Sequence, residues 1–245
     1  MKRNIFIILA FFLTLYGSSG SSRGNNAEPL QYYPLFILSG QSNMQLLDIG
    51  YFLPIIEETF GPGTIAVKDT LSGQSITNWY DKYDLLAGDG DGDPVGWFYY
   101  LLKRKIFSAI GNKNIRDVFF IWMQGETDGL YPNRYSEVYE ENLIGLIKLI
   151  ESDLRHKFNS EIKFNFVIGR INEFGRKFPN KVAQWDAIRE AQVRVAENYP
   201  NGTWVNTDDL GTIDNGLHFD DIEYRLLGER FARAAISLSN NYVNF

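Results

Sequence analysis

The 245-residue sequence predicts a three-layer α/β fold in which a five-stranded parallel sheet lies between two layers of helices. Short apolar runs alternate along the chain with longer stretches in which apolar residues recur every three or four positions. Most of the short runs are almost continuously apolar, which is typical of parallel strands that are covered on both faces. Because the sequence has no internal repeat, we expect these elements to form one domain.

Five runs predict strands because each is short and either continuously apolar or alternating. They cover residues 35–38, 64–68, 117–122, 163–168 and 203–205. Four longer runs predict helices because their apolar side chains would lie on one helix face. They cover residues 95–110, 135–158, 182–198 and 221–238. In parallel sheets of this kind, reacting groups lie in the loops beyond the carboxyl ends of the strands.

The N-terminal residues have the order of a signal peptide. Basic residues at positions 2 and 3 precede an apolar run over residues 5–16, and small residues follow over 17–22. The apolar run is shorter than the ~20 residues that a membrane-spanning helix needs, although an uncleaved anchor is the alternative. We therefore expect residues 1–22 to direct export without stable membrane insertion, residues 23–30 to form a linker, and residues 31–245 to form the domain.

The composition restricts the partners of the chain. Lys and Arg total 24 against 30 Asp and Glu, so the net charge of −6 leaves no cationic surplus for a phosphate backbone. We expect no nucleic acid partner. The sequence contains no cysteine, which excludes disulfide bonds and a lipid-modified cysteine after the signal peptide.

Two loops at strand ends carry residues suited to acyl transfer. The first predicted strand leads directly into Ser42, and Gly40 allows a tight backbone path before it. An ordinary Ser/Asn turn is the alternative interpretation. After the second strand, a loop of small residues contains Gly73, whose backbone N–H could face a developing oxyanion.

Two further loops supply acids, an amide and an imidazole. The third strand ends before Gln124, Glu126 and Asp128, a stretch that could also be a polar loop capping the next helix. Of the two histidines, His156 lies near a helix C-terminus and is expected at the surface. His218 follows a glycine in a loop before the last helix, where a neutral imidazole could take the proton of Ser42.

A glycine- and aspartate-rich segment at residues 88–94 is similar to the start of a calcium-binding loop. Pro94 replaces the glycine of such loops, and Tyr100 stands where the bidentate glutamate should be. A mobile loop, with Asp93 as the cap of the following helix, is the simpler interpretation. We expect no metal site.

The four loops together resemble the SGNH-hydrolase superfamily and, within it, the SASA family of sialate O-acetylesterases and acetylxylan esterases. The matching blocks occur in the family's order, at residues 40–44, 73–75 with Trp79, 122–128 and 216–219. The resemblance covers roughly residues 34–236. It implies a three-layer α/β/α fold with a five-stranded parallel sheet, as in SGNH hydrolases and flavodoxin-like proteins.

The resemblance implies a serine carboxylic-ester hydrolase that removes acetyl groups from sugars or polysaccharides through an acetyl-serine intermediate. Ser42 would be the nucleophile and His218 its base. The oxyanion hole would consist of the backbone N–H groups of Ser42 and Gly73 and the side-chain amide of Gln124. Gln41, Asn43 and Trp79 would contact the substrate. This chemistry requires no metal or organic cofactor.

One position departs from the superfamily pattern. The aspartate expected three residues before the histidine is replaced by Asn215, and Asp214 is the nearest acid. An amide cannot neutralise an imidazolium. The alternatives are that Asp214 reaches His218 because Gly216 lets the loop bulge, that a backbone carbonyl orients the ring in a Ser–His dyad, or, less favoured, that Glu126 approaches it.

Two other functions stay open at this stage. Asn215 is compatible with a catalytically weak carbohydrate-binding protein on the same fold, although the retention of Ser42, Gln124 and His218 argues against it. An esterase for other acyl chains would need an apolar channel that the sequence alone does not reveal.

Overall fold

The computed structural model describes residues 30–83, 95–131, 133–158, 162–213 and 216–240. The predicted signal peptide, all but the last residue of the predicted linker, the segment at 88–94, Asp214 and Asn215 lie outside the described residues. Residues Gln31–Phe245 form one compact unit. Within the described ranges, no helix has the length and apolar character needed to cross a membrane.

The sheet confirms the predicted α/β class. Its strands all run parallel, in the order β2-β1-β3-β4-β5, which is the flavodoxin-like order. All five predicted strands are present, and each is longer than predicted. They are β1 (Tyr32–Gly40), β2 (Ile65–Thr70), β3 (Asn114–Met123), β4 (Lys163–Gly169) and β5 (Gly202–Val205).

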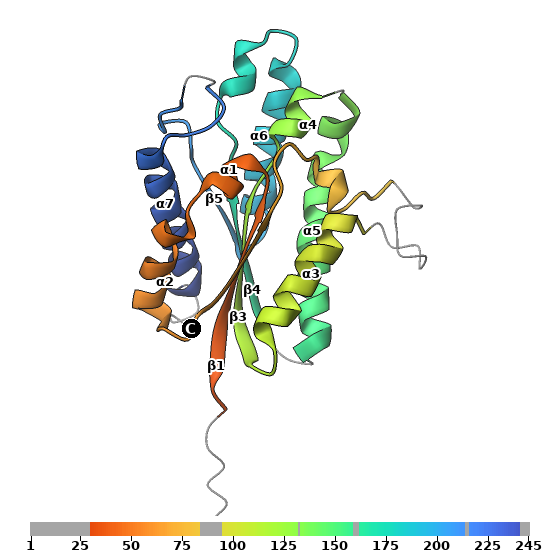
Figure 1. The fold of residues 1–245 in the computed structure, drawn as a ribbon. Coiled ribbons are helices and arrows are strands. Elements are labelled where there is room, and N and C mark those ends of the chain that lie inside the picture. Colours follow the sequence, from red (N-terminus) through yellow and green to blue (C-terminus); the bar gives the residue numbers. More distant parts are fainter. Residues whose placement is uncertain (1–29, 84–94, 132, 159–161, 214–215, 241–245) are drawn as a thin grey trace, which may run out of the picture. The chain divides into compact units, whose positions relative to one another are not determined.

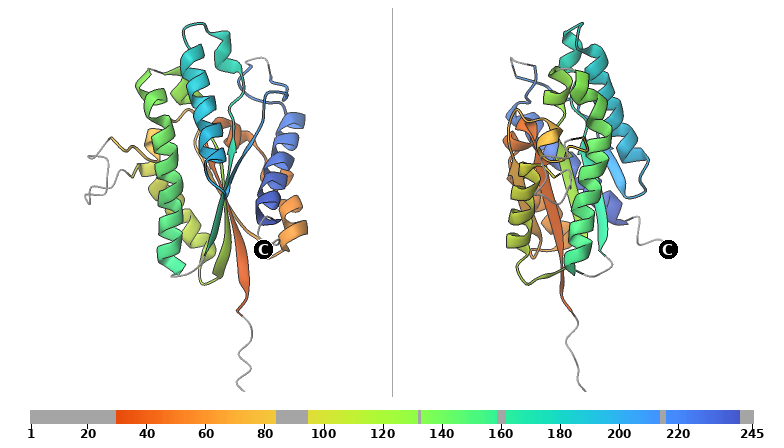
Figure 2. Two further views of the ribbon diagram at one scale, coloured as in Figure 1. Left: turned by 180° about the vertical axis from the view of Figure 1, so that it is seen from behind. Right: turned by 90° about the vertical axis from the view of Figure 1, so that its right-hand side faces the viewer.

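Helices cover both faces of the sheet (Figure 1). One face carries α3 (Trp97–Ile110), α5 (Asn133–Phe158) and α6 (Val182–Glu197), and the other carries α2 (Leu53–Phe60) and α7 (Asp221–Asn240). Figure 2 shows the same division from behind and from the side. The four predicted helices are confirmed. The sequence analysis missed α2, whose two turns are too short for a clear period.

Short helical segments occupy several loops. They are α1 (Ser42–Leu46), α4 (Glu126–Leu130) and the 3₁₀ turns η1 (Ile49–Tyr51), η2 (Ile76–Asn78) and η3 (Phe174–Lys177). Of these, α1 and α4 begin directly after β1 and β3, so they lie beyond the same edge of the sheet (Figure 1).

Alternate residues of the central strands enter separate cores. Phe120 and Trp122 of β3 pack under α3, α5 and α6, whereas Phe119 and Ile121 pack under α2 and α7. All four side chains are fully buried. Successive side chains of a strand point to opposite faces of the sheet. Because both faces are buried here, the strand is apolar at nearly every position.

Three strands end in register at one edge of the sheet. Gly40, the last residue of β1, pairs with Thr70 at the end of β2 and with Met123 at the end of β3. The loops that follow these strands therefore start side by side. Gly40 has φ +141°, and a Cβ atom there would lie 1.9 Å from the carbonyl oxygen of Met123. No side chain fits between the two strands at this point.

We expect Gly40→Ala to destabilise the fold more than Gly61→Ala. Both glycines have positive φ, which costs an alanine roughly 1–2 kcal/mol, but a Cβ at Gly61 would meet no atom within 4 Å. Overpacking against the backbone of Met123 should add about 1–3 kcal/mol at Gly40. Urea unfolding of the two variants measures the difference. Equal losses would show that the strand ends separate readily.

Candidate active site

A pocket of about 360 Å³ lies at the carboxyl edge of the sheet, where the predicted loops meet. Its polar lining includes Ser42, Gly73 and His218, three of the residues expected to act together. Leu46, Leu130, Tyr131 and Leu217 form much of its apolar wall. The fold therefore brings the first, second and last sequence blocks to one hollow.

Ser42 and His218 are in direct contact. The Oγ atom of Ser42 lies 3.0 Å from Nε2 of His218, although the residues are 176 positions apart. Ser42 is only 8% exposed and is the first residue of α1. When the proton of the neutral ring is on Nδ1, Nε2 can accept the hydroxyl hydrogen of Ser42. This is the geometry of a nucleophile with its base.

Burial lowers the pKa of His218 below its ordinary value. Removal from water disfavours the charged imidazolium, so the ring stays neutral to a lower pH. A base has to be neutral before it can accept a proton. Burial therefore favours the proton-accepting form of His218.

Hydrogen bonds hold the loop that carries His218. Its backbone carbonyl accepts from the N–H of Ile213 at 2.9 Å, beside an antiparallel bridge between Thr212 and Phe219. The carbonyl of the preceding residue, Leu217, accepts from the side-chain amides of Asn43 at 3.3 Å and Asn172 at 3.1 Å. The backbone at His218 is thus tied to the loops after β1 and β4.

Asn172 is a site-supporting residue that sequence reasoning missed. Its Oδ1 accepts from the N–H of Phe174 at 2.9 Å, and its backbone carbonyl accepts from Trp185 Nε1 at 2.6 Å. Its position directly after the fourth predicted strand was the available signal. An asparagine there also fits an ordinary turn, so only the distance to Leu217 reveals what it holds.

The expectation that Asn43 contacts substrate is corrected by its burial. Asn43 is fully buried, its Nδ2 donates to Glu126 Oε1 at 2.7 Å, and its Oδ1 accepts from the hydroxyl of Tyr224 at 2.9 Å. With the bond to Leu217, both ends of the amide are engaged within the protein. Asn43 therefore links the segment after β1 to Glu126, Leu217 and Tyr224.

Glu126 does not take the place of the missing aspartate. Its Oε1 bonds to Asn43, and its buried Oε2 has no hydrogen-bond partner, so neither oxygen is bonded to the imidazole of His218. Burial raises the pKa of Glu126, and the bond from Asn43 opposes that rise. Asp214, the favoured candidate, lies outside the described residues.

Gln124 is placed differently from the oxyanion donor that the sequence suggested. Its side chain is fully buried, and Nε2 donates to the carbonyl of Gln74 at 2.9 Å and to the carboxylate of Asp128. Both amide hydrogens are therefore used inside the protein. Gly73, in contrast, lines the pocket as expected.

Asp128 fixes the loop that contains Gly73. Its carboxylate accepts from the hydroxyl of Ser75 at 2.6 Å and from the N–H of Ile76 at 3.2 Å, besides the amide of Gln124. Burial raises its pKa to about 7, and these donors act against the rise. The second and third blocks are thus joined beneath the pocket.

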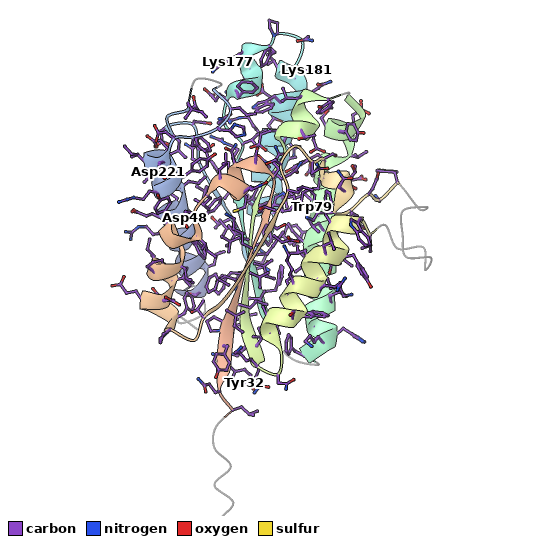
Figure 3. All side chains as sticks on the ribbon, viewed as in Figure 1. Tyr32, Asp48, Trp79, Lys177, Lys181 and Asp221 are labelled. Atoms are coloured by element: carbon purple, nitrogen blue, oxygen red, sulfur yellow. The ribbon has the colours of Figure 1, made fainter. Side chains whose placement is uncertain are left out.

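Trp79 is a core residue and not a sugar-stacking platform. Figure 3 labels Trp79, which is 1% exposed. Its ring packs edge-on at 5.2 Å from the rings of both Phe98 and Trp122. A ring that is only 1% exposed offers almost no surface to a sugar. Gln41, the third residue expected to contact substrate, does line the pocket.

The second histidine of the sequence analysis, His156, lies at the surface, as predicted. His156 lies in the last turn of α5 and is exposed. Because α5 runs back against the strand direction before β4 begins, this turn lies away from the edge of the sheet that carries the pocket. His156 therefore serves as a natural control for His218.

Residues 64–237 match the model of a protein family described as carbohydrate esterase, sialic acid-specific acetylesterase. The matched region contains Gly73, Gln124 and His218 and begins after Ser42. No curated protein matches the chain.

Solved structures share the fold at low sequence identity. A protein from Arabidopsis thaliana is 18% identical, with a TM-score of 0.59, and the alignment covers 83% of this chain and 98% of that one. NanS is 13% identical, with a TM-score of 0.59 and coverage of 86% and 98%. A carbohydrate acetylesterase from Xanthomonas citri is 17% identical, with a TM-score of 0.61 and coverage of 84% and 57%.

Burial disfavours the charged form of the His218 imidazole, so we expect its pKa to lie below the ordinary value of about 6.5 in a Ser–His dyad, and to lie higher if the Asp214 carboxylate contacts the ring. Proton NMR of the ring hydrogens measures the midpoint, and His156→Gln leaves His218 as the single histidine signal. A midpoint well above ~6.5 would contradict the dyad. It would indicate a carboxylate against the ring, in which case Asp214→Asn should lower the midpoint.

Proposed function

The chain belongs to the family of carbohydrate esterases described as sialic acid-specific acetylesterases, and we propose that it hydrolyses acetyl esters on sugars or polysaccharides with Ser42 as nucleophile. The observation that carries this proposal is the 3.0 Å contact between Ser42 Oγ and His218 Nε2 inside the pocket. A serine hydroxyl is a weak nucleophile until a neighbouring base takes its proton.

The reaction proceeds in two halves. Ser42 Oγ attacks the acetyl carbonyl while its proton passes to His218 Nε2, and the tetrahedral intermediate then expels the sugar hydroxyl, which receives that proton. In the second half, His218 takes a proton from water as the water oxygen attacks the acetyl-serine. The second intermediate then releases acetic acid, while Ser42 Oγ leaves and recovers its proton from His218. The backbone N–H groups of Ser42 and Gly73 stabilise the oxyanion in both halves.

The partner of the second ring nitrogen of His218 is proposed to be Asp214, with a backbone carbonyl in a Ser–His dyad as the alternative. The engagement of Glu126 with Asn43 supports this order. A carboxylate at Nδ1 would favour the imidazolium that forms during proton transfer. The NMR titration described above distinguishes the two arrangements.

The pocket lining fits an acetylated sugar. Leu46 and Tyr131 are both more than half exposed at its rim, where apolar and aromatic surface can cover the C–H face of a sugar ring. Thr127 and Ser72 add hydroxyls that can bond to the sugar. The apolar wall also makes longer acyl esters the second candidate, which comparison of acetyl and butyryl esters tests.

Export of the protein is proposed from the order of basic, apolar and small residues over positions 1–22. An extracellular location would give the enzyme access to polysaccharide. We expect N-terminal sequencing of protein from the native host to start after position 16, beyond the apolar run. Recovery of intact protein beginning at Met1 would contradict a cleaved signal.

We expect Ser42→Ala and His218→Ala each to abolish acetate release from acetylated sugars, because one removes the nucleophile and the other its base. His156→Ala should retain wild-type turnover, since that side chain is exposed and remote from the pocket. Turnover is measured on acetylated xylan, on an O-acetylated sialic acid and on p-nitrophenyl acetate. Wild-type turnover by folded Ser42→Ala would refute the nucleophile assignment.

A further inference from the structure

The amide expected to complete the oxyanion hole is already occupied. Gln124 Nε2 carries two hydrogens, which go to the carbonyl of Gln74 and to the carboxylate of Asp128. To turn toward the substrate, Gln124 would have to give up its hydrogen bonds to the buried carboxylate of Asp128 and to the carbonyl of Gln74. The loss of these two bonds opposes the movement, although Asp128 would keep other donors. Gln124 is therefore held as a support of the Gly73 loop.

A second amide, on Gln41, stands beside the nucleophile. Gln41 immediately precedes Ser42, is 2% exposed and lines the pocket. Its Oε1 accepts from the backbone N–H groups of Gly125 at 3.5 Å and Thr127 at 3.4 Å. These two bonds are long. Both donors belong to the segment that follows β3, so the carbonyl end of the Gln41 amide points toward that segment.

The other end of this amide has no acceptor in the protein. Within the described ranges, the hydrogen bonds of the Gln41 side chain are made by Oε1 and none is made by Nε2, and Nε2 is not among the fully enclosed side-chain atoms that lack a partner. Because Gln41 lines the pocket, a ligand there can supply the acceptor that the protein does not. With Oε1 fixed on the Gly125 and Thr127 amides, the N–H groups of Gln41 are left for the pocket.

We propose that the side-chain amide of Gln41, and not that of Gln124, is the third donor to the oxyanion. The proposal rests on Ser42 being the nucleophile. When the bond between Ser42 Oγ and the carbonyl carbon forms, the π electron pair moves to the carbonyl oxygen and the hydroxyl proton moves to His218. The resulting negative oxygen accepts from the backbone N–H groups of Ser42 and Gly73 and from Gln41 Nε2. Collapse of the intermediate returns that pair to the carbonyl and releases these bonds.

The two glutamines have distinct tasks in this arrangement. Gln124 holds the carbonyl of Gln74, so it positions the loop from which Gly73 projects its N–H. Gln41 contacts the reacting oxygen itself. Because the charge on that oxygen exists only in the intermediate and its transition states, Gln41 should affect turnover more than substrate affinity.

Gln41→Glu is the most informative variant. It keeps an oxygen for the N–H groups of Gly125 and Thr127 and replaces only the donating NH₂ group. Gln41→Met is the uncharged second variant. We expect kcat for p-nitrophenyl acetate to fall about 10²–10³-fold in both, as when one oxyanion donor is lost, with KM nearly unchanged. Gln41→Glu keeps the acceptor of the Gly125 and Thr127 N–H groups, so its melting temperature should stay close to that of the wild type, whereas Gln41→Met removes that acceptor and its turnover is compared on folded protein.

Gln124→Met is the matched control. Because it removes a donor from Asp128 and from the Gln74 carbonyl, it should lower the melting temperature more than Gln41→Glu does. p-Nitrophenyl acetate carries no sugar, so an effect on this ester cannot come from sugar binding. Wild-type kcat in folded Gln41→Met, or a raised KM confined to sugar esters, would overturn the proposal.

Failure of the nucleophile assignment gives a different result. Wild-type protein treated with a fluorophosphonate should be modified at Ser42, as identified by peptide mass spectrometry. If the wild type hydrolyses p-nitrophenyl acetate without such labelling, the proposed function of Ser42 fails together with the role of Gln41. If Ser42 is labelled but the Gln41 variants keep the turnover of the wild type, the proposed function of Ser42 stands. Only the proposed role of Gln41 is then wrong.

Discussion

The parallel pairing of β1 with β2 and β3 is the constraint on which the site depends. Gly40 lies level with Thr70 on one side and with Met123 on the other, so three chain segments leave the sheet at the same height. Parallel strands all present their carboxyl ends at one edge, and the loops beyond that edge become neighbours whatever their separation in sequence. The close approach at Gly40 leaves no room for a side chain to separate them.

Buried polar side chains then lock these loops to one another. Asn43 joins the first loop to Glu126 and to Leu217, while Asp128 joins the second and third loops through Ser75. Each hydrogen bond adds only about 0.5–1.5 kcal/mol to stability, but removal of one partner leaves a buried group unpaired and costs more. The network therefore contributes mainly a defined arrangement. The contact between Ser42 and His218 is held in place before any ester binds, which reduces the reorganisation needed during the reaction.

The same network explains why similar side chains have different functions. Gln41 and Gln124 are both buried amides at the carboxyl edge, yet one lines the pocket and the other is enclosed by Asp128 and Gln74. Glu126 and Asp128 are both buried acids in one helical turn, and each is bonded to a different loop. The chemistry available to each group follows from which of its atoms the protein already uses.

The sequence by itself determined the α/β class, the five strands, the four long helices and the positions of Ser42, Gly73 and His218 at the ends of elements. The prediction is possible because burial of strands and of one helix face fixes the spacing of apolar residues along the chain. The end of each such apolar pattern also marks where a loop begins. The short helix α2 left no such trace. Tertiary structure alone decided that Asn43 and Trp79 are enclosed, that Gln124 supports a loop, and that Asn172 holds the carbonyl of Leu217. These outcomes depend on distances between segments far apart in the chain, and a local pattern of residue types carries no information about which hydrogen-bond partners such segments will meet.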